Sequence, residues 1–295
     1  MSVLSVSLFG RLDVQVDGQP LPAFESRKVE ELFCHLLLNR GRPRWRESLA
    51  ELLWPQAAAN VGRRYLRKAL WQLQHAFAPA GLAPFTVEPE WVEVNTAAGF
   101  ELDVSRFEAA FQGAHTLPGQ GLTAEMAHSL RQAVDLYRGD LLENRYQDWL
   151  LFERERLRLD YIIMLEKLMA YSEAHQDHEA GLDYGLRVLR LDHAHERTHR
   201  LLMRFHLMAG RPAAALQQYE RCAATLRLEL GVEPGPKTVA LYQHIRAGSP
   251  LPASGPPAAL AAPAGAAELH SRLTTLETAL DQAQAEVRQL RSLLA

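Results

Sequence analysis

The chain has 295 residues, of which 47% are hydrophobic and 23% charged, so it is long enough for two or three domains with sizeable cores. It has no run of 18 or more apolar residues and no basic-then-apolar leader at Met1, which argues against a membrane span and a secretion signal and favours the cytoplasm. The net charge of −3 conceals an asymmetry, because residues 26–80 hold ten Lys and Arg against four Glu.

The first hundred residues predict short strands, three helices and a hairpin, in that order. Residues 3–21 alternate apolar and polar side chains, which is typical of short β-strands. Residues 26–41 and 44–54 carry apolar side chains at helical spacing, and the longer pattern of a third helix follows. Residues 84–95, PFTVEPEWVEVN, alternate again and predict a hairpin.

The third helix, predicted over residues 60–77, has two different sides. At about 100° per residue, the apolar side chains gather on one side and predict a core stripe. This stripe consists of Leu66, Leu70, Leu73 and Phe77. The opposite side holds Asn60, Arg63, Arg64, Arg67, Lys68 and Trp71.

The cations of this helix have no acid one helical turn away, so they repel one another unless a partner outside the helix compensates them. Duplex DNA accepts Arg and Lys contacts, and its major groove has the width of a helix. The pattern therefore predicts contact with DNA. A solvated cationic helix face is the alternative.

The same segments resemble a known family. The N-terminal hairpin, the phrase LLLNRGRPRWRESLAELLWP and the third helix are similar to the winged helix-turn-helix domain of the Streptomyces antibiotic regulatory protein family of bacterial activators, whose DNA-binding module is of the OmpR type. The resemblance implies base and phosphate contacts from the four cations of the third helix. It also implies phosphate contacts from Arg44 and Arg46 at the start of the second helix, where the helix terminus adds positive charge.

Three features of this region depart from the family or leave a choice open. Family members commonly carry basic residues where this chain has Gln74 and His75. The hairpin, which would be the wing, carries glutamates rather than cations, so we expect it to contribute little to DNA binding. Trp71 either stacks on sugar and phosphate edges or helps to bury the helix against the wing.

Residues 101–247 predict a nearly all-helical region. Its breaks at Gln176-Asp177 and Gly210-Arg211-Pro212 lie 34 residues apart, which is the tetratricopeptide period. Stacked helix pairs are therefore expected. The phrase HRLLM…AGRPAAALQQYERC…LRLELGVEPGPKTVALY resembles the bacterial transcriptional activator domain of the same regulator family, which implies contact with RNA polymerase or with a second copy of the chain.

The segment HERTH, His195 to His199, matches the H-E-x-x-H pattern of zinc metalloproteases. Glu196 would then be the general base, and Glu220 or His193 a third ligand. The same residues fit a helix of the repeat domain, which is the interpretation we favour. We therefore predict no metal, no cofactor and no catalytic residue.

The C-terminal segment predicts a linker followed by a coiled coil. Residues 248–267 are rich in Pro and Ala and contain no charge, which is typical of a linker. An unbroken heptad pattern follows over residues 268–295 and predicts a parallel homodimer. Its apolar positions are Leu269, Leu273, Leu276, Leu280, Ala283, Val287, Leu290 and Leu294. Folding back onto the body, or pairing with another protein, is the alternative.

Together these patterns predict a mainly α protein with four parts. A winged helix-turn-helix domain of mixed α and β structure spans residues 1–98, and a tetratricopeptide-like bacterial transcriptional activator domain spans 99–247. A linker at 248–267 and a dimerisation helix at 268–295 complete the chain.

The predicted function is a cytoplasmic bacterial transcription regulator that binds double-stranded promoter DNA and recruits RNA polymerase, rather than an enzyme. A tetratricopeptide-like adaptor for a peptide or small ligand is the second hypothesis, and a zinc hydrolase is the third.

Overall fold

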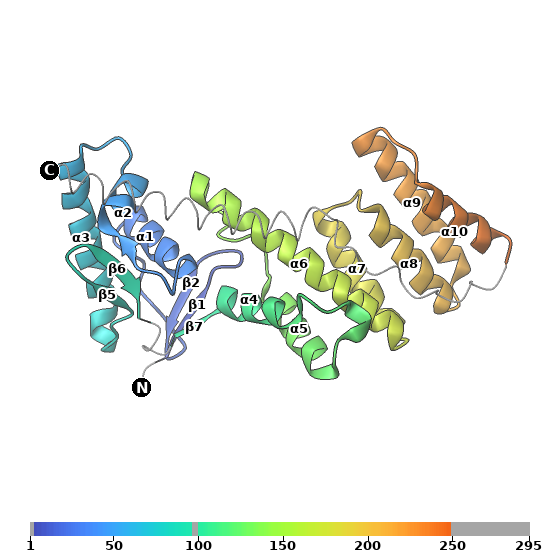
Figure 1. Ribbon diagram of the computed structural model, residues 1–295, viewed down its shortest axis with the longest axis horizontal. Coiled ribbons are helices and arrows are strands. Elements are labelled where there is room, and N and C mark those ends of the chain that lie inside the picture. The colour runs from blue at the N-terminus through green and yellow to red at the C-terminus, as the bar shows by residue number, and fades with distance from the viewer. Residues whose placement is uncertain (1–2, 96–99, 249–295) are drawn as a thin grey trace. The chain divides into compact units, whose positions relative to one another are not determined.

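The computed structural model describes residues 3–95 and 100–248 (Figure 1). The N-terminal strands form one small sheet in the order β3-β2-β1-β7. Its members are β1 (Leu4–Ser7), β2 (Asp13–Val16), β3 (Gln19–Pro20) and β7 (Phe100–Leu102). Strands β1 and β2 are antiparallel, whereas β7 joins β1 in parallel with Leu102 opposite Val6. Because β7 follows the hairpin in sequence, the chain returns to its first sheet before the helical region starts.

Three helices pack together beside this sheet. They are α1 (Arg27–Leu38), α2 (Arg46–Leu53) and α3 (Ala59–Phe77), which is followed by the short 3-10 helix η1 (Ala78–Ala80). Helix α1 begins where the Ser26 side chain accepts a hydrogen bond from the Val29 N–H. Phe33 of α1 and Phe77 of α3 are fully buried, with ring centroids 5.6 Å apart. The predicted three-helix order is therefore present.

The predicted hairpin is also present, with one strand that the sequence did not predict. It consists of β5 (Phe85–Val87) and β6 (Trp91–Val94), and β4 (Arg44–Trp45) pairs with β6. The second helix therefore begins at Arg46, and Arg44 lies in the strand before it rather than in the helix. The strand β4 ties the start of α2 to the hairpin.

The helical region consists of antiparallel helices packed in sequence (Figure 1). They are α4 (Asp103–Ala114), the 3-10 helix η3 (Gly119–Gly121), α5 (Ala124–Leu136), α6 (Asp148–Ala174), α7 (His178–Leu191), α8 (Glu196–Met208) and α9 (Pro212–Leu230). The two breaks that lie one repeat apart adopt the same left-handed backbone, with φ 58° at Gln176 and φ 71° at Gly210.

Helices α7 and α8 approach each other closely at two glycines. A Cβ atom on Gly181 would lie 2.3 Å from the Phe205 ring, and one on Gly185 would lie 2.5 Å from a Leu202 methyl group. A side chain at either position would force the helices apart, because the neighbours are buried and packed.

Residues 235–248 belong to a separate compact unit that contains α10 (Pro236–Arg246). Over the described ranges, none of the helices combines the length and the apolar character that crossing a membrane requires. The predicted coiled coil at 268–295 lies outside the described residues.

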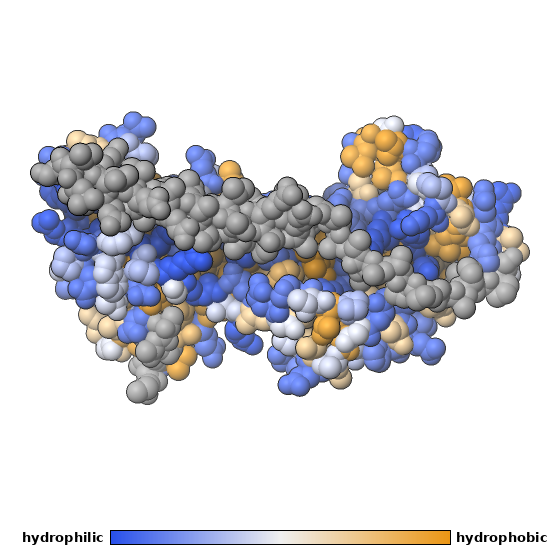
Figure 2. Space-filling model, viewed as in Figure 1, coloured by the Kyte–Doolittle hydropathy of each residue, from blue (hydrophilic) through white to orange (hydrophobic). Residues whose placement is uncertain are grey.

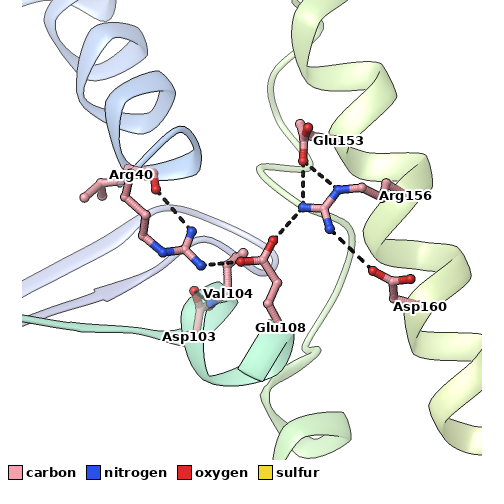
Figure 3. A network of polar contacts seen from close by, with 8 residues as sticks. Arg40, Asp103, Val104, Glu108, Glu153, Arg156 and Asp160 are labelled. Atoms are coloured by element: carbon pink, nitrogen blue, oxygen red, sulfur yellow. Dashed lines mark hydrogen bonds and ion pairs between the residues drawn. The ribbon is translucent and has the colours of Figure 1, made fainter. Parts of the chain in front are cut away.

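A network of ion pairs joins the N-terminal helices to the helical region (Figure 3). Arg40, just after α1, pairs with Glu108 of α4, and Arg156 of α6 lies 2.6 Å from the same carboxylate. Arg156 also contacts Glu153 at 2.8 Å and Asp160 at 3.4 Å. We call these five residues the buried network, since each side chain is at most one quarter exposed.

Candidate nucleic-acid interface

Helix α3 is fixed in place by the apolar side that the sequence predicted. Leu66, Leu70, Leu73 and Phe77 are all buried. Burial of each such side chain stabilises the fold by roughly 1.5 to 3 kcal/mol, so this side determines the rotation of the helix about its axis. The residues on the other side must then point outward.

The outward side of α3 is exposed along its whole length. We call it the α3 face, and it consists of Asn60, Arg63, Arg64, Arg67, Lys68 and Trp71. The structure therefore brings these six predicted residues together on one surface of one helix. Gln74 and His75 extend the same surface toward the helix C-terminus.

The cations of the α3 face differ in their partners. Arg63 forms an exposed ion pair with Glu47 of α2, with Nη1 3.3 Å from the carboxylate oxygen. The Arg64 guanidinium lies 5.7 Å from the centre of the neighbouring Tyr65 ring. Within residues 3–95 and 100–248, Arg64, Arg67 and Lys68 form no ion pair with a carboxylate. Three cations of this face therefore remain available to an external anion.

Arg46 has a second role that the sequence did not predict. Its Nη1 donates a hydrogen bond of 3.1 Å to the Glu88 carbonyl, and its backbone N–H donates to the Glu90 carbonyl at 2.9 Å. The side chain thus holds the turn of the hairpin. Partial burial and the positive charge of Arg67 lower the pKa of Arg46.

The hairpin itself offers no cation at its turn. Glu88, Pro89 and Glu90 are exposed there, and all the charged side chains of the hairpin are acidic. A negatively charged turn is unfavourable beside a phosphate backbone. We therefore still predict that the hairpin contributes little to DNA binding, because its exposed turn carries acidic side chains.

Trp71 is the largest apolar group on the α3 face. Its side chain is 54% exposed, and its ring lies 4.0 Å from the His75 ring at an interplanar angle of 31°. This aromatic contact is within α3 and not with the hairpin, so it favours an outward role over burial against the wing. Sequence reasoning treated His75 only as a missing cation and missed this contact, although the i, i+4 spacing is a signal for it.

The HERTH segment is built as part of the fold. His195 precedes α8, and His199 is buried. The two ring nitrogens of His199 both have partners, because Nδ1 lies 2.7 Å from Gln218 Nε2 and Nε2 lies 2.9 Å from the His193 carbonyl oxygen. Burial lowers the pKa of His199. No cluster of potential metal ligands occurs in the described part of the chain.

A second exposed surface lies at the end of α9. Figure 2 shows hydrophobic side chains gathered there. Leu228 is 86% exposed, and Leu230 and Val232 are also exposed. Such a group of large apolar side chains in water is characteristic of a protein contact surface.

Comparison with known proteins places this geometry in a regulatory context. Residues 102–246 match the family model of the bacterial transcriptional activator domain. The transcriptional regulatory protein EmbR of Mycobacterium tuberculosis is 24% identical over 259 residues, which cover 85% of this chain and 65% of EmbR. The match therefore spans less than two thirds of the length of this relative.

Two further relatives carry related names. The transcriptional regulatory protein MoaR1 of Mycobacterium tuberculosis is 24% identical over 81% of this chain and 78% of its own length. The regulatory protein AfsR of Streptomyces coelicolor is 26% identical over 84% of this chain, which corresponds to 24% of AfsR. A solved structure of EmbR in complex with a low affinity phosphopeptide superposes with a TM-score of 0.66 at 22% identity, over 85% of this chain and 67% of the EmbR chain.

The structural similarity shows that the mainly α fold with an N-terminal mixed part is shared with EmbR. The matched domain and the named relatives are transcriptional regulators rather than enzymes. Over residues 102–246 the chain thus matches the bacterial transcriptional activator domain, and over most of its length it is similar to proteins named as transcriptional regulators.

Proposed function

We propose that this protein binds double-stranded promoter DNA through the α3 face and thereby regulates transcription. The observation that carries the proposal is that Arg64, Arg67 and Lys68 are exposed and have no carboxylate partner among the described residues, on a helix whose other side is fixed in the core. A major groove admits a helix of this diameter, and its phosphates supply the anions that these cations lack. Arg63 and Asn60 lie beside them and complete the contact surface.

Charge reversal on α3 tests this proposal. The double variant Arg64→Glu, Arg67→Glu changes the charge of the α3 face by four units. It should lower duplex affinity by about a hundredfold or more, because attraction to phosphate becomes repulsion. Both side chains are exposed, so the melting temperature should stay nearly unchanged.

A matched control separates this site from total charge. Arg221→Glu, Arg227→Glu makes the same change in net charge on α9, where both side chains are exposed. Titrations at several salt concentrations should show a steep fall of wild-type affinity with salt. Equal losses in the two double variants, or none in either, would contradict an interface on α3.

The helical region has a different proposed role, contact with RNA polymerase, which the family resemblance implies. The exposed apolar surface of Leu228, Leu230 and Val232 supports such a contact. Leu228→Asp should leave DNA affinity unchanged while it lowers transcription in a reconstituted assay several-fold. Loss of DNA binding in this variant would contradict the division of roles.

Homodimerisation through residues 268–295 is the third part of the proposal. Two linked DNA-binding domains bind repeated sites more tightly than one, because the second contact becomes intramolecular. Removing residues 268–295 should therefore lower the mass measured by sedimentation and weaken DNA binding. An unchanged mass would remove this segment from the dimer interface.

A ligand-binding role of the helical region is a second candidate function. The observation that favours it is a surface hollow of about 390 Å³ between α7 and α9, which Leu182, His206 and Arg221 help to line. Its volume suits a small ligand. An adaptor of this kind would lack the steep salt dependence of DNA binding, so the same titrations distinguish the two functions.

A further inference from the structure

Trp71 occupies the middle of the α3 face. At about 100° per residue, it lies within about 40° of Asn60, Arg64 and Arg67 around the helix axis. Arg63 and Lys68 lie at the two margins of this arc. The centre of a predominantly cationic surface is thus taken by a large apolar ring.

The local contacts hold this ring outward. Trp71 is 54% exposed, and its described aromatic contact is with the exposed His75 ring one turn further along α3. The two ring centroids are 4.0 Å apart and the rings are tilted by 31°, so His75 covers part of the indole. The remaining indole surface faces solvent, where it stabilises the free protein less than burial would.

The position of Trp71 determines which part of DNA it meets. When a helix lies in the major groove, the cations at its margins reach the phosphates on either side. The residues in the middle of the arc then face the base edges on the floor of the groove. Of the four bases, only thymine presents an apolar group there, its C5-methyl. An indole ring has matching apolar character, whereas a phosphate or a sugar hydroxyl does not.

We propose that Trp71 contacts the C5-methyl group of a thymine in the major groove and thereby makes that base a requirement of the binding site. This inference rests on the proposed function, since it needs α3 to lie in the groove. It would make the α3 face, whose other large side chains are cations, selective for one particular base. Arg63 and Lys68 at the margins would supply affinity through the phosphates, and Trp71 would supply discrimination.

The test compares thymine with deoxyuridine, which differs only by the absent methyl group. Sequences bound by the wild-type full-length protein are first selected from a random duplex library. Each thymine of the selected site is then replaced singly by deoxyuridine, and affinities are measured at fixed salt. We call the stretch of DNA bound by one copy of the chain a half-site. For the wild type, one replacement in each half-site should weaken binding about fourfold, which is the value expected for one buried methyl group.

The variants assign this effect to its residue. Trp71→Ala should bind the thymine and deoxyuridine duplexes equally, and so should Trp71→Gln, which keeps a long side chain on the helix. Tyr65→Ala is the matched control, because Tyr65 is an exposed aromatic of α3 that lies outside the α3 face. It should keep the fourfold preference.

Each result decides the proposal. Wild-type binding that no single deoxyuridine weakens, or a preference that persists in Trp71→Ala and Trp71→Gln, would overturn the thymine contact while DNA binding itself stands. Failure of the library to yield any bound sequence would instead refute the proposed function, and the thymine contact with it.

Discussion

Two groups of arginines in this protein have opposite surroundings. In the buried network, Arg40 and Arg156 are 17% and 23% exposed and pair with carboxylates from two helices, α4 and α6 (Figure 3). On the α3 face, Arg64 and Arg67 are exposed and have no carboxylate partner among the described residues. The number of arginines in a segment therefore does not indicate a binding surface. A binding surface is indicated by arginines that are exposed and lack carboxylate partners.

The difference has an energetic basis. A buried guanidinium loses its hydration and needs carboxylates of the same chain to replace it. In Arg156, burial lowers the pKa, but the carboxylates of Glu153 and Glu108 outweigh burial, so the pKa is raised overall. An exposed guanidinium keeps its hydration and can exchange it for a phosphate contact. The first group should therefore affect stability and the second DNA binding.

The largest expected effect comes from removing the central cation of the buried network. Arg156→Met leaves Glu108, Glu153 and Asp160 close together without their shared partner. The free energy of unfolding should fall by roughly 3 kcal/mol, as for other broken buried pairs. Urea denaturation measures this, with Arg67→Met as a control that should change it by less than about 0.5 kcal/mol. Equal effects of the two variants would remove the distinction between the groups.

Asp160 makes the stability of the network depend on pH. Burial raises the pKa of Asp160 to about 7, and the nearby Arg156 only partly offsets this. A carboxyl group whose pKa is raised on folding stabilises the fold while it is protonated, so its contribution is complete below pH 4 and is lost as the pH rises through 7. Relative to Asp160→Asn, the wild type should therefore lose roughly 2 kcal/mol of unfolding free energy between pH 4 and 8. If the unfolding free energies of the two proteins changed in parallel with pH, a raised pKa of Asp160 would be contradicted.

The sequence was sufficient to predict the α3 helix and its two sides because both follow from a local period. Leu66 and Phe77 recur at helical spacing, and a residue opposite to them on the helix must face outward. The hairpin around residues 88–90 was predictable for the same reason, since alternation is also a local signal.

The buried network could not be predicted in this way. Arg40 and Glu108 are 68 residues apart, and Glu108 and Arg156 are 48 apart, so only the packing of α4 and α6 beside α1 brings them together. The strand β4 was missed because two residues carry too little pattern, and its existence depends on pairing with β6. The second role of Arg46 follows from that pairing, which places Arg46 beside the Glu88 carbonyl.

A smaller effect is expected when DNA affinity, and not stability, is compared between the α3 face and the buried network. Lys68→Ala on the α3 face should lower duplex affinity about tenfold and reduce the slope of log affinity against log salt by about 1, because one phosphate contact is lost. Arg40→Met should leave this slope unchanged at a temperature where circular dichroism shows the variant to be folded. A reduced slope in Arg40→Met would mean that the buried network also contacts DNA.

The smallest expected effect concerns Arg63, the cation of the α3 face that shares features of both groups. It is 56% exposed yet pairs with Glu47, which is 69% exposed. Such surface pairs contribute only about 0 to 1 kcal/mol to stability, so Glu47→Gln should leave the melting temperature nearly unchanged. It should tighten DNA binding about threefold, because it removes a negative charge near the phosphates and frees Arg63.

Glu51→Gln removes the same charge from α2, where Glu51 has no ion pair with another described residue, and should have the smaller effect. If Glu51→Gln tightened binding equally, general charge and not the release of Arg63 would account for the gain.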